Sequence, residues 1–205
     1  GPAPWADYSP QRVDWMGWRM IRDYSGGILT DWGAHIVDTA QVGASAEKSG
    51  PVEIKGSGAI PDGVMNTAKQ TFDLHYTFAN GVTMHVVSKG VRLKFIGSEG
   101  WCGNRGWRGG IEAHDRRIFK QTYTESNIWP QPPGEHRDFL NSVKSRKDPA
   151  YPAEDIHRLS TTLHLGAIAM ELGRTLKWDP DKEYFVGDEQ ADTLRSRTAR
   201  DWAKA

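Results

Sequence analysis

Acidic and imidazole side chains recur at helical spacing within residues 25–41, SGGILTDWGAHIVDTAQ. His35 follows Asp31 by four positions, and Asp38 follows three positions later. On a helix with about 3.6 residues per turn, these side chains share one face. A carboxylate one turn from an imidazole can hold its tautomer and prepare a general acid/base, so Asp31 and His35 are candidate catalytic residues. From the spacing alone, the more frequent arrangement is structural, with Asp31 capping the helix and His35 in the core.

Aromatic and polar residues gather on the N-terminal side of this pair. The sequence holds nine tryptophans, and indole rings commonly stack on sugars, although they also fill aromatic cores. Arg19, Asp23 and Tyr24 bring polar groups close to the expected helix, where they could also bond its N-terminus. We therefore expect a sugar or glycoside as ligand. The expected substrate-binding residues are Arg19, Asp23, Tyr24, Trp15, Trp18, Trp32 and Asp38.

The helix that carries the catalytic pair is expected to run from about Thr30 to Val42. Gly26-Gly27 signals a turn before it, and Thr30 or Asp31 has the chemistry of an N-cap. Residues 1–24 contain three early prolines, which predict an extended or irregular arm without a helix.

Hydrophobic periodicity changes from helical to alternating after Pro51. Strands are expected at 52–60, 69–78 and 82–88, with Asn80-Gly81 as a two-residue hairpin turn. His75 and His85 fall on alternating positions, where surface or cross-strand roles are more frequent than metal ligation. Further strands are expected at 91–96, 101–104, 111–113 and 117–120.

Helical patterns return in the last third of the chain. Residues 134–146 predict a short amphipathic helix with Phe139, Leu140 and Val143 inward. Residues 153–176 predict the longest helix, with Gly173 near its end. A final helix is expected at 189–197, and Trp202 closes the tail.

This order of elements predicts an α+β fold, with an open, mostly antiparallel sheet and helices packed on one face. We expect a single domain over residues 1–205, comprising an arm at 1–24 and a C-terminal tail and helix at 181–205. The second face of the sheet would need a cover. A second copy of the chain could supply it, so a homo-oligomer is expected.

Composition excludes several classes of partner. The formal net charge is zero, so nothing indicates nucleic acid or an anionic membrane. A single cysteine, Cys102, excludes an internal disulfide framework. No apolar run reaches the roughly 20 residues of a membrane span, and no signal peptide is visible, so the cytoplasm is the expected location. Asp31 and His35 with Asp38 or His136 lack a standard ligand spacing, so no metal is expected.

Motifs of other enzyme classes are missing. No GxGxxG follows a strand and opens a helix, so no dinucleotide site is expected in this chain. The GxSxG elbow of serine hydrolases and the P-loop are also absent from the sequence.

Several motifs in fixed order resemble the C-terminal substrate domain of the Gfo/Idh/MocA oxidoreductases, especially bacterial members acting on sugars. The resemblance covers almost the whole chain. The motifs are GGILTDWGAHIVD (26–38), the Asn80-Gly81 hairpin, FIGSEGW (95–101), HRDFLNSVKSRKDP (136–149), HLGAIAMELGRTLKWDP (164–180) and EQADTLRSRTARDW (189–202).

The resemblance implies that Asp31 and His35 match the family's Asp-x-x-x-His pair, in which the histidine exchanges a proton with a substrate hydroxyl. It also implies NAD(P) as cofactor, bound by an N-terminal Rossmann domain that carries a catalytic lysine. Neither that domain nor the lysine motif occurs in this sequence. NAD(P) is therefore expected only if a Rossmann domain is supplied separately.

Three functions remain open at this point. The favoured one is a cofactor-independent, sugar-acting enzyme of the glycoside hydrolase or lyase type. The first alternative is the substrate domain of an NAD(P)-dependent sugar or polyol dehydrogenase, inactive alone. The second alternative is a non-catalytic sugar-binding or oligomerisation module.

Overall fold

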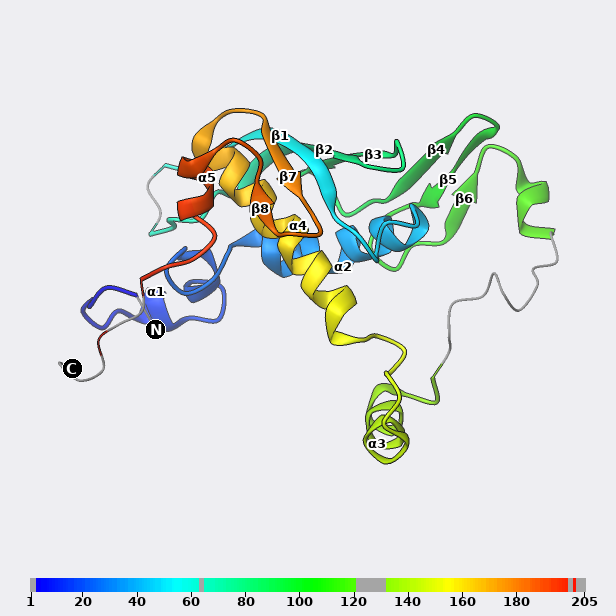
Figure 1. The fold of residues 1–205 in the computed structure, drawn as a ribbon, viewed down its shortest axis with the longest axis horizontal. Coiled ribbons are helices and arrows are strands. Elements are labelled where there is room, and N and C mark those ends of the chain that lie inside the picture. The colour runs from blue at the N-terminus through cyan, green and yellow to red at the C-terminus, as the bar shows by residue number, and fades with distance from the viewer. Residues whose placement is uncertain (1–2, 63–64, 121–131, 199–200, 202–205) are drawn as a thin grey trace. The chain divides into compact units, whose positions relative to one another are not determined.

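The computed structural model describes residues 3–62, 65–120, 132–198 and 201 (Figure 1). The chain divides into two compact units, Gly1–Gly90 with Arg158–Ala205, and Val91–His157. The expectation for Trp202 lies outside the described residues, and the single domain over 1–205 stays a prediction.

The first unit is built on a five-stranded open sheet in which every neighbouring pair is antiparallel (Figure 1). The α+β class and the antiparallel sheet predicted from the sequence are therefore confirmed. In spatial order the strands are β3 (Thr83–Val87), β2 (Thr71–Phe78), β1 (Pro51–Ala59), β7 (Leu176–Asp179) and β8 (Tyr184–Phe185).

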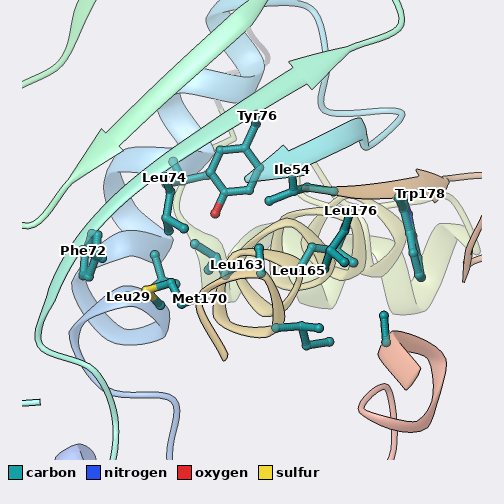
Figure 2. Packing of buried hydrophobic residues seen from close by; sticks show 14 of the residues in the cluster. Leu29, Ile54, Phe72, Leu74, Tyr76, Leu163, Leu165, Met170, Leu176 and Trp178 are labelled. Atoms are coloured by element: carbon teal, nitrogen blue, oxygen red, sulfur yellow. The ribbon is translucent and has the colours of Figure 1, made fainter. Parts of the chain in front are cut away.

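Strand β2 separates the two faces of this sheet by strict alternation. Phe72, Leu74, Tyr76 and Phe78 are buried, whereas the residues between them point to the other face. Helices α2 (Ile28–Gly43) and α4 (Ala153–Leu172) supply the opposing apolar side chains. Figure 2 shows this core between the sheet and α4, including Ile54, Leu163, Leu165, Met170 and Leu176.

Helix α4 approaches β2 closely at Gly166. A Cβ atom added to Gly166 would lie 2.1 Å from the hydroxyl oxygen of Tyr76. That hydroxyl is buried and has no hydrogen-bond partner among the described residues, and burial raises the pKa of Tyr76. Residue 166 must therefore be glycine because a side chain would not fit there, and not because the backbone conformation requires glycine.

The outer face of the sheet is largely polar. Lys55 and Ser57 on β1 lie beside His75 and Asp73 on β2, and all four are exposed. An antiparallel sheet with a polar face can meet water directly, so this face does not require the cover that we expected. The homo-oligomer stays a prediction.

The hairpin between β2 and β3 has a three-residue loop, not the expected two-residue turn. The Phe78 amide donates to the Val82 carbonyl at 2.9 Å, which leaves residues 79–81 in the loop. Gly81 adopts φ +85°, a conformation that suits glycine and matches a loop with a bulge. The Asn80 side chain donates to the Ala44 carbonyl at 3.0 Å and anchors the hairpin to the end of α2.

Two segments of the first unit, the N-terminal arm and the end of α4, differ from expectation. Pro10 begins the short helix α1 (Pro10–Val13), because proline is tolerated in a first helical turn, and η1 (Trp18–Met20) is a 3-10 turn. Helix α4 stops at Leu172, where Gly173 adopts φ +64°, so Leu176 begins a strand instead of ending the helix.

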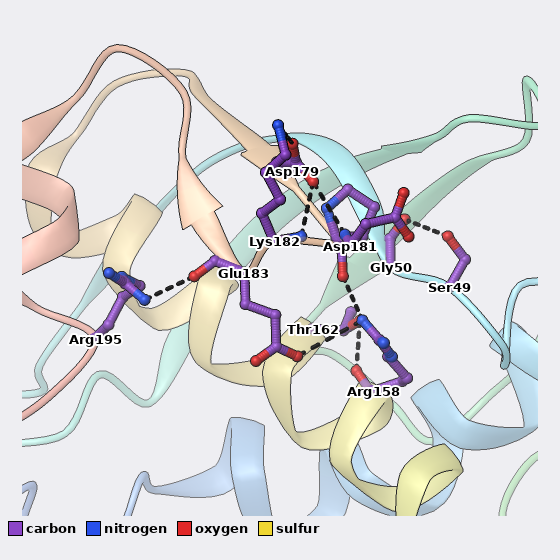
Figure 3. Close-up of polar contacts among 10 residues, drawn as sticks. Ser49, Gly50, Arg158, Thr162, Asp179, Asp181, Lys182, Glu183 and Arg195 are labelled. Carbon is purple, nitrogen blue, oxygen red and sulfur yellow. Dashed lines mark hydrogen bonds and ion pairs between the residues drawn. The ribbon is translucent and has the colours of Figure 1, made fainter.

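Polar contacts fix the turn between β7 and β8 (Figure 3). The Asp179 carboxylate accepts from the backbone amides of Asp181 at 3.0 Å and Lys182 at 2.9 Å. Arg158 of α4 donates to the Pro180 carbonyl, and Arg195 donates to the Glu183 carbonyl at 2.7 Å. The final helix α5 (Glu189–Thr193) follows and is shorter than predicted.

The second unit contains a three-stranded antiparallel sheet of β4 (Lys94–Gly97), β5 (Gly100–Asn104) and β6 (Ile111–Ala113). Residues predicted as a last strand form the 3-10 helix η2 (Arg116–Lys120) instead.

Helix α3 (Glu135–Ser145) has the predicted span but not the predicted burial. Phe139, Leu140 and Val143 are exposed, so the inward orientation expected from their spacing is wrong for this chain. No helix of the described residues is long and apolar enough to cross a membrane.

Prediction from the α4–β2 contact. Gly166→Ala is expected to lower the free energy of unfolding, because overpacking costs about 1–3 kcal/mol and helix propensity returns at most about 1 kcal/mol. Tyr76→Phe removes the opposing oxygen, so the same substitution should cost less in that background. Urea denaturation of the four proteins measures the coupling, and additive effects would contradict the close approach.

Prediction from Asp188. Its carboxylate caps α5 through the Ala191 amide at 3.0 Å, and Arg174 donates to it at 2.8 Å. The Arg174 hydrogen bond, then the Ala191 amide, lowers the pKa of Asp188. The folded pKa lies below the unfolded value of about 3.9, so the stabilisation is present above that pH and is lost as pH falls through the folded pKa.

Asp188→Ala should therefore lower the Tm at neutral pH, and its difference from the wild type should shrink below about pH 4. Circular dichroism melts across pH measure this. Asp62→Ala, at an exposed aspartate, is the matched control, and a difference that does not change with pH would refute the assignment.

Candidate functional site

The candidate site begins at the N-terminus of α2, which Gly27 sets. Gly27 is the N-cap residue with φ +74°, and a Cβ there would lie 2.8 Å from the Cβ of Ala68. The helix therefore starts at Ile28, two residues before the predicted start. Neither Thr30 nor Asp31 is the N-cap, so the capping role expected for them is wrong.

Packing against α4 determines which face of α2 meets solvent. A Cβ on Gly33 would lie 3.3 Å from the Leu163 side chain, and Leu29 and Val37 are fully buried. His35 lies off this stripe and is exposed. The structural alternative, with His35 in the core, is therefore wrong.

Arg19 holds the Asp31 carboxylate. Its Nη1 atom donates to Oδ2 of Asp31 at 3.0 Å, and the two side chains are only 26% and 28% exposed. The guanidinium also lies 4.7 Å from the ring centre of Trp15 and 5.7 Å from that of Trp18. These cation–π contacts restrict Arg19 and so orient the carboxylate.

Trp32 and His35 occupy the neighbouring part of the helix surface. Their ring centres are 6.5 Å apart in an edge-on arrangement. Trp15, Trp18 and Trp32 are all exposed, which leaves indole surface available for a flat apolar face of a ligand.

Asp23 and Tyr24 each contact an arginine other than Arg19. The Asp23 carbonyl accepts from Arg197 at 3.3 Å, and the Tyr24 hydroxyl accepts from Arg12 at 3.4 Å. Sequence reasoning missed both arginines. Arg197 lies 174 positions from Asp23, so no local spacing could have indicated this contact.

The structure thus joins Arg19, Trp15 and Trp18 to Asp31, and joins Trp32 to His35. Asp38 is half-buried one turn beyond His35. The roles of all these residues toward a substrate stay predictions. An exposed imidazole one turn from a fixed carboxylate is suited to exchanging a proton with a hydroxyl group.

The motif that usually binds a nicotinamide dinucleotide does not occur in this sequence. The sequence has no GxGxxG after a strand, and its glycine groups at 97–110 lie among β4, β5 and β6. The chain's residues therefore do not fit a dinucleotide through that motif.

The family model for the oxidoreductase family C-terminal alpha/beta domain, GFO_IDH_MocA_C2, matches residues 1–204. No curated protein matches the chain. The chain spans about half the length of the solved structures that it resembles, and the likeness to them is one of fold.

Two of these structures are an aldose-aldose oxidoreductase from Caulobacter crescentus complexed with glycerol and an NAD-binding protein from Listeria innocua. Both are 18% identical over 78% of this chain and 50% of their own, with TM-scores of 0.56 and 0.59. A third is levoglucosan dehydrogenase in complex with NADH and L-sorbose, 15% identical over 83% of this chain and 55% of its own, with a TM-score of 0.52. The chain therefore belongs to the Gfo/Idh/MocA oxidoreductase family and corresponds to its C-terminal domain.

Proposed function

We propose that this chain is the substrate-binding half of a nicotinamide-dependent sugar or polyol oxidoreductase. The observation that carries the proposal is the exposed His35 imidazole, one turn from an Asp31 carboxylate held by Arg19. The family match supports an oxidoreductase, and two similar structures contain glycerol or L-sorbose.

Each residue has a distinct role in this proposal. His35 exchanges the proton of a substrate hydroxyl, because its ring is accessible from solvent. The Asp31 carboxylate supplies a negative charge near the His35 imidazole that exchanges the proton, and Arg19 keeps this carboxylate in place. Trp15 and Trp18 offer indole faces to the sugar ring.

The hydride in such a reaction requires a carrier, which nicotinamide supplies when bound. This chain contributes the binding, the orientation and the proton exchange. The carrier would be held by residues outside this sequence.

The glycoside hydrolase or lyase interpretation has weaker support. Glycoside cleavage usually needs two carboxyl groups facing the bond. The family match is instead to an oxidoreductase domain. Sugar binding without turnover remains the outcome that would favour a non-catalytic module.

Prediction for sugar binding. Titration of the chain with glycerol, L-sorbose, glucose and inositol should change tryptophan fluorescence saturably for at least one ligand. Trp15→Ala and Trp18→Ala should each weaken that binding about 2–10-fold, as expected for the loss of one aromatic contact of about 0.5–1.5 kcal/mol. Trp107→Ala, at an exposed tryptophan of the second unit, is the matched control and should bind normally. Equal effects of all three substitutions would contradict the placement of the ligand.

Prediction for catalysis. Supplied with a nicotinamide-binding domain, the chain should oxidise the bound ligand, measured by absorbance of the reduced cofactor. His35→Ala should lower kcat by about 10²–10⁴-fold, the usual contribution of general acid–base catalysis, with little change in ligand Kd. His136→Ala, at an exposed histidine on α3, should leave kcat unchanged. Cleavage of aryl glycosides without nicotinamide would instead favour the hydrolase.

A further inference from the structure

Three potential metal ligands meet on the outer face of the sheet, opposite the helices. Asp73 and His75 are two positions apart on β2 and therefore share this face. His85 on β3 lies directly across from His75 in the antiparallel register. The three-residue loop at 79–81 sets that register, and a one-residue slip would turn His85 to the opposite face.

The three side chains converge on one point. Nε2 of His75 and Nε2 of His85 each lie 2.9 Å from the same oxygen, Oδ1 of Asp73. The imidazole rings are stacked, with centres 4.2 Å apart and planes 10° from parallel. One potential ligand atom from each residue lies within 4.8 Å of the other two.

The cluster is open to solvent. The side chains of Asp73, His75 and His85 are 55%, 49% and 52% exposed, so an ion can enter and keep water ligands. Asp73 and His75 also line a cavity of about 300 Å³ together with Lys55 and Arg174. Nη2 of Arg174 lies 2.8 Å from Oδ1 of Asp188, which offsets its charge. Among the described residues that line this cavity, Lys55 is then the cation that opposes a metal.

We propose that Asp73, His75 and His85 bind a divalent first-row transition metal of the zinc class. Two imidazole nitrogens and one carboxylate oxygen suit Zn²⁺, Co²⁺, Ni²⁺ or Cu²⁺. One protein carboxylate is too few oxygen ligands for Ca²⁺, which takes about 6–8, and Mg²⁺ also prefers oxygen ligands. The remaining coordination positions face the solvent.

The spacing of the ligands is close to what such an ion requires. Bonds of about 2.0–2.2 Å to nitrogen and oxygen separate tetrahedral ligands by somewhat more than 3 Å. The present nitrogen–oxygen separations of 2.9 Å need only a small opening. Small changes in the exposed side-chain torsions can supply this opening, because the β2–β3 backbone pairing does not have to move.

Calorimetry with Zn²⁺ on tag-free protein tests the site, and visible absorption of Co²⁺ reports its ligand field. We expect one saturable site, no binding of Mg²⁺, and a Zn²⁺-dependent rise in Tm that chelator reverses. His75→Ala and His85→Gln should each weaken Zn²⁺ binding at least about tenfold, since loss of a ligand costs no less than loss of an outer-shell partner. His85→Gln keeps a hydrogen-bond donor for Asp73, which protects the fold.

The matched control is His136→Ala. His136 is an exposed histidine 3.3 Å from the Glu135 carboxylate, but this pair has no second imidazole. Its removal should leave Zn²⁺ affinity unchanged. The proposal is overturned if wild-type protein shows no saturable binding, or if His75→Ala and His85→Gln bind Zn²⁺ as tightly as wild type.

Discussion

The contact of α4 with β2 is the constraint on which the first unit depends. One face of β2 must be apolar to cover the helix, and strict alternation then makes the other face polar. The absence of a side chain at Gly166 lets the Tyr76 ring lie under the helix without displacing it. Both candidate sites follow from this arrangement, because α4 also orients α2 and the exposed face of β2 carries the metal ligands.

The candidate site on α2 combines rigid and accessible parts. Gly27 allows the helix to start against Ala68, and Gly33 allows it to approach Leu163 closely. Arg19 then ties the preceding arm to Asp31 through an ion pair and two aromatic contacts. A fixed carboxylate beside a solvent-accessible imidazole is what substrate orientation and proton exchange both require.

Local periodicity predicted most of the elements but not their long-range partners. The alternation of β2 and the spacing on α2 gave both elements within two residues, because burial of one face sets each pattern. The sequence predicts helix at Leu176, because the pairing of Leu176 with Ile54 spans over 100 residues and no local signal reports it. The proximity of Arg19 to Asp31 was expected, whereas the contact of Arg197 with Asp23 depends on the folded chain. His85 shows the same limit of local patterns. Its position across from His75 depends on the length of the loop at 79–81, so the ligand geometry could not be predicted before that loop was known.

The position of β7 has a consequence for how the protein is made. A ribosome delivers β1, β2 and β3 before β7, and they can pair with one another as they emerge. The other edge of β1 stays unpaired until β7 (Leu176–Asp179) has been synthesised, well over a hundred residues after the first residue of β1. Nascent chains therefore carry an open strand edge until β7 emerges, and such edges invite pairing with other chains.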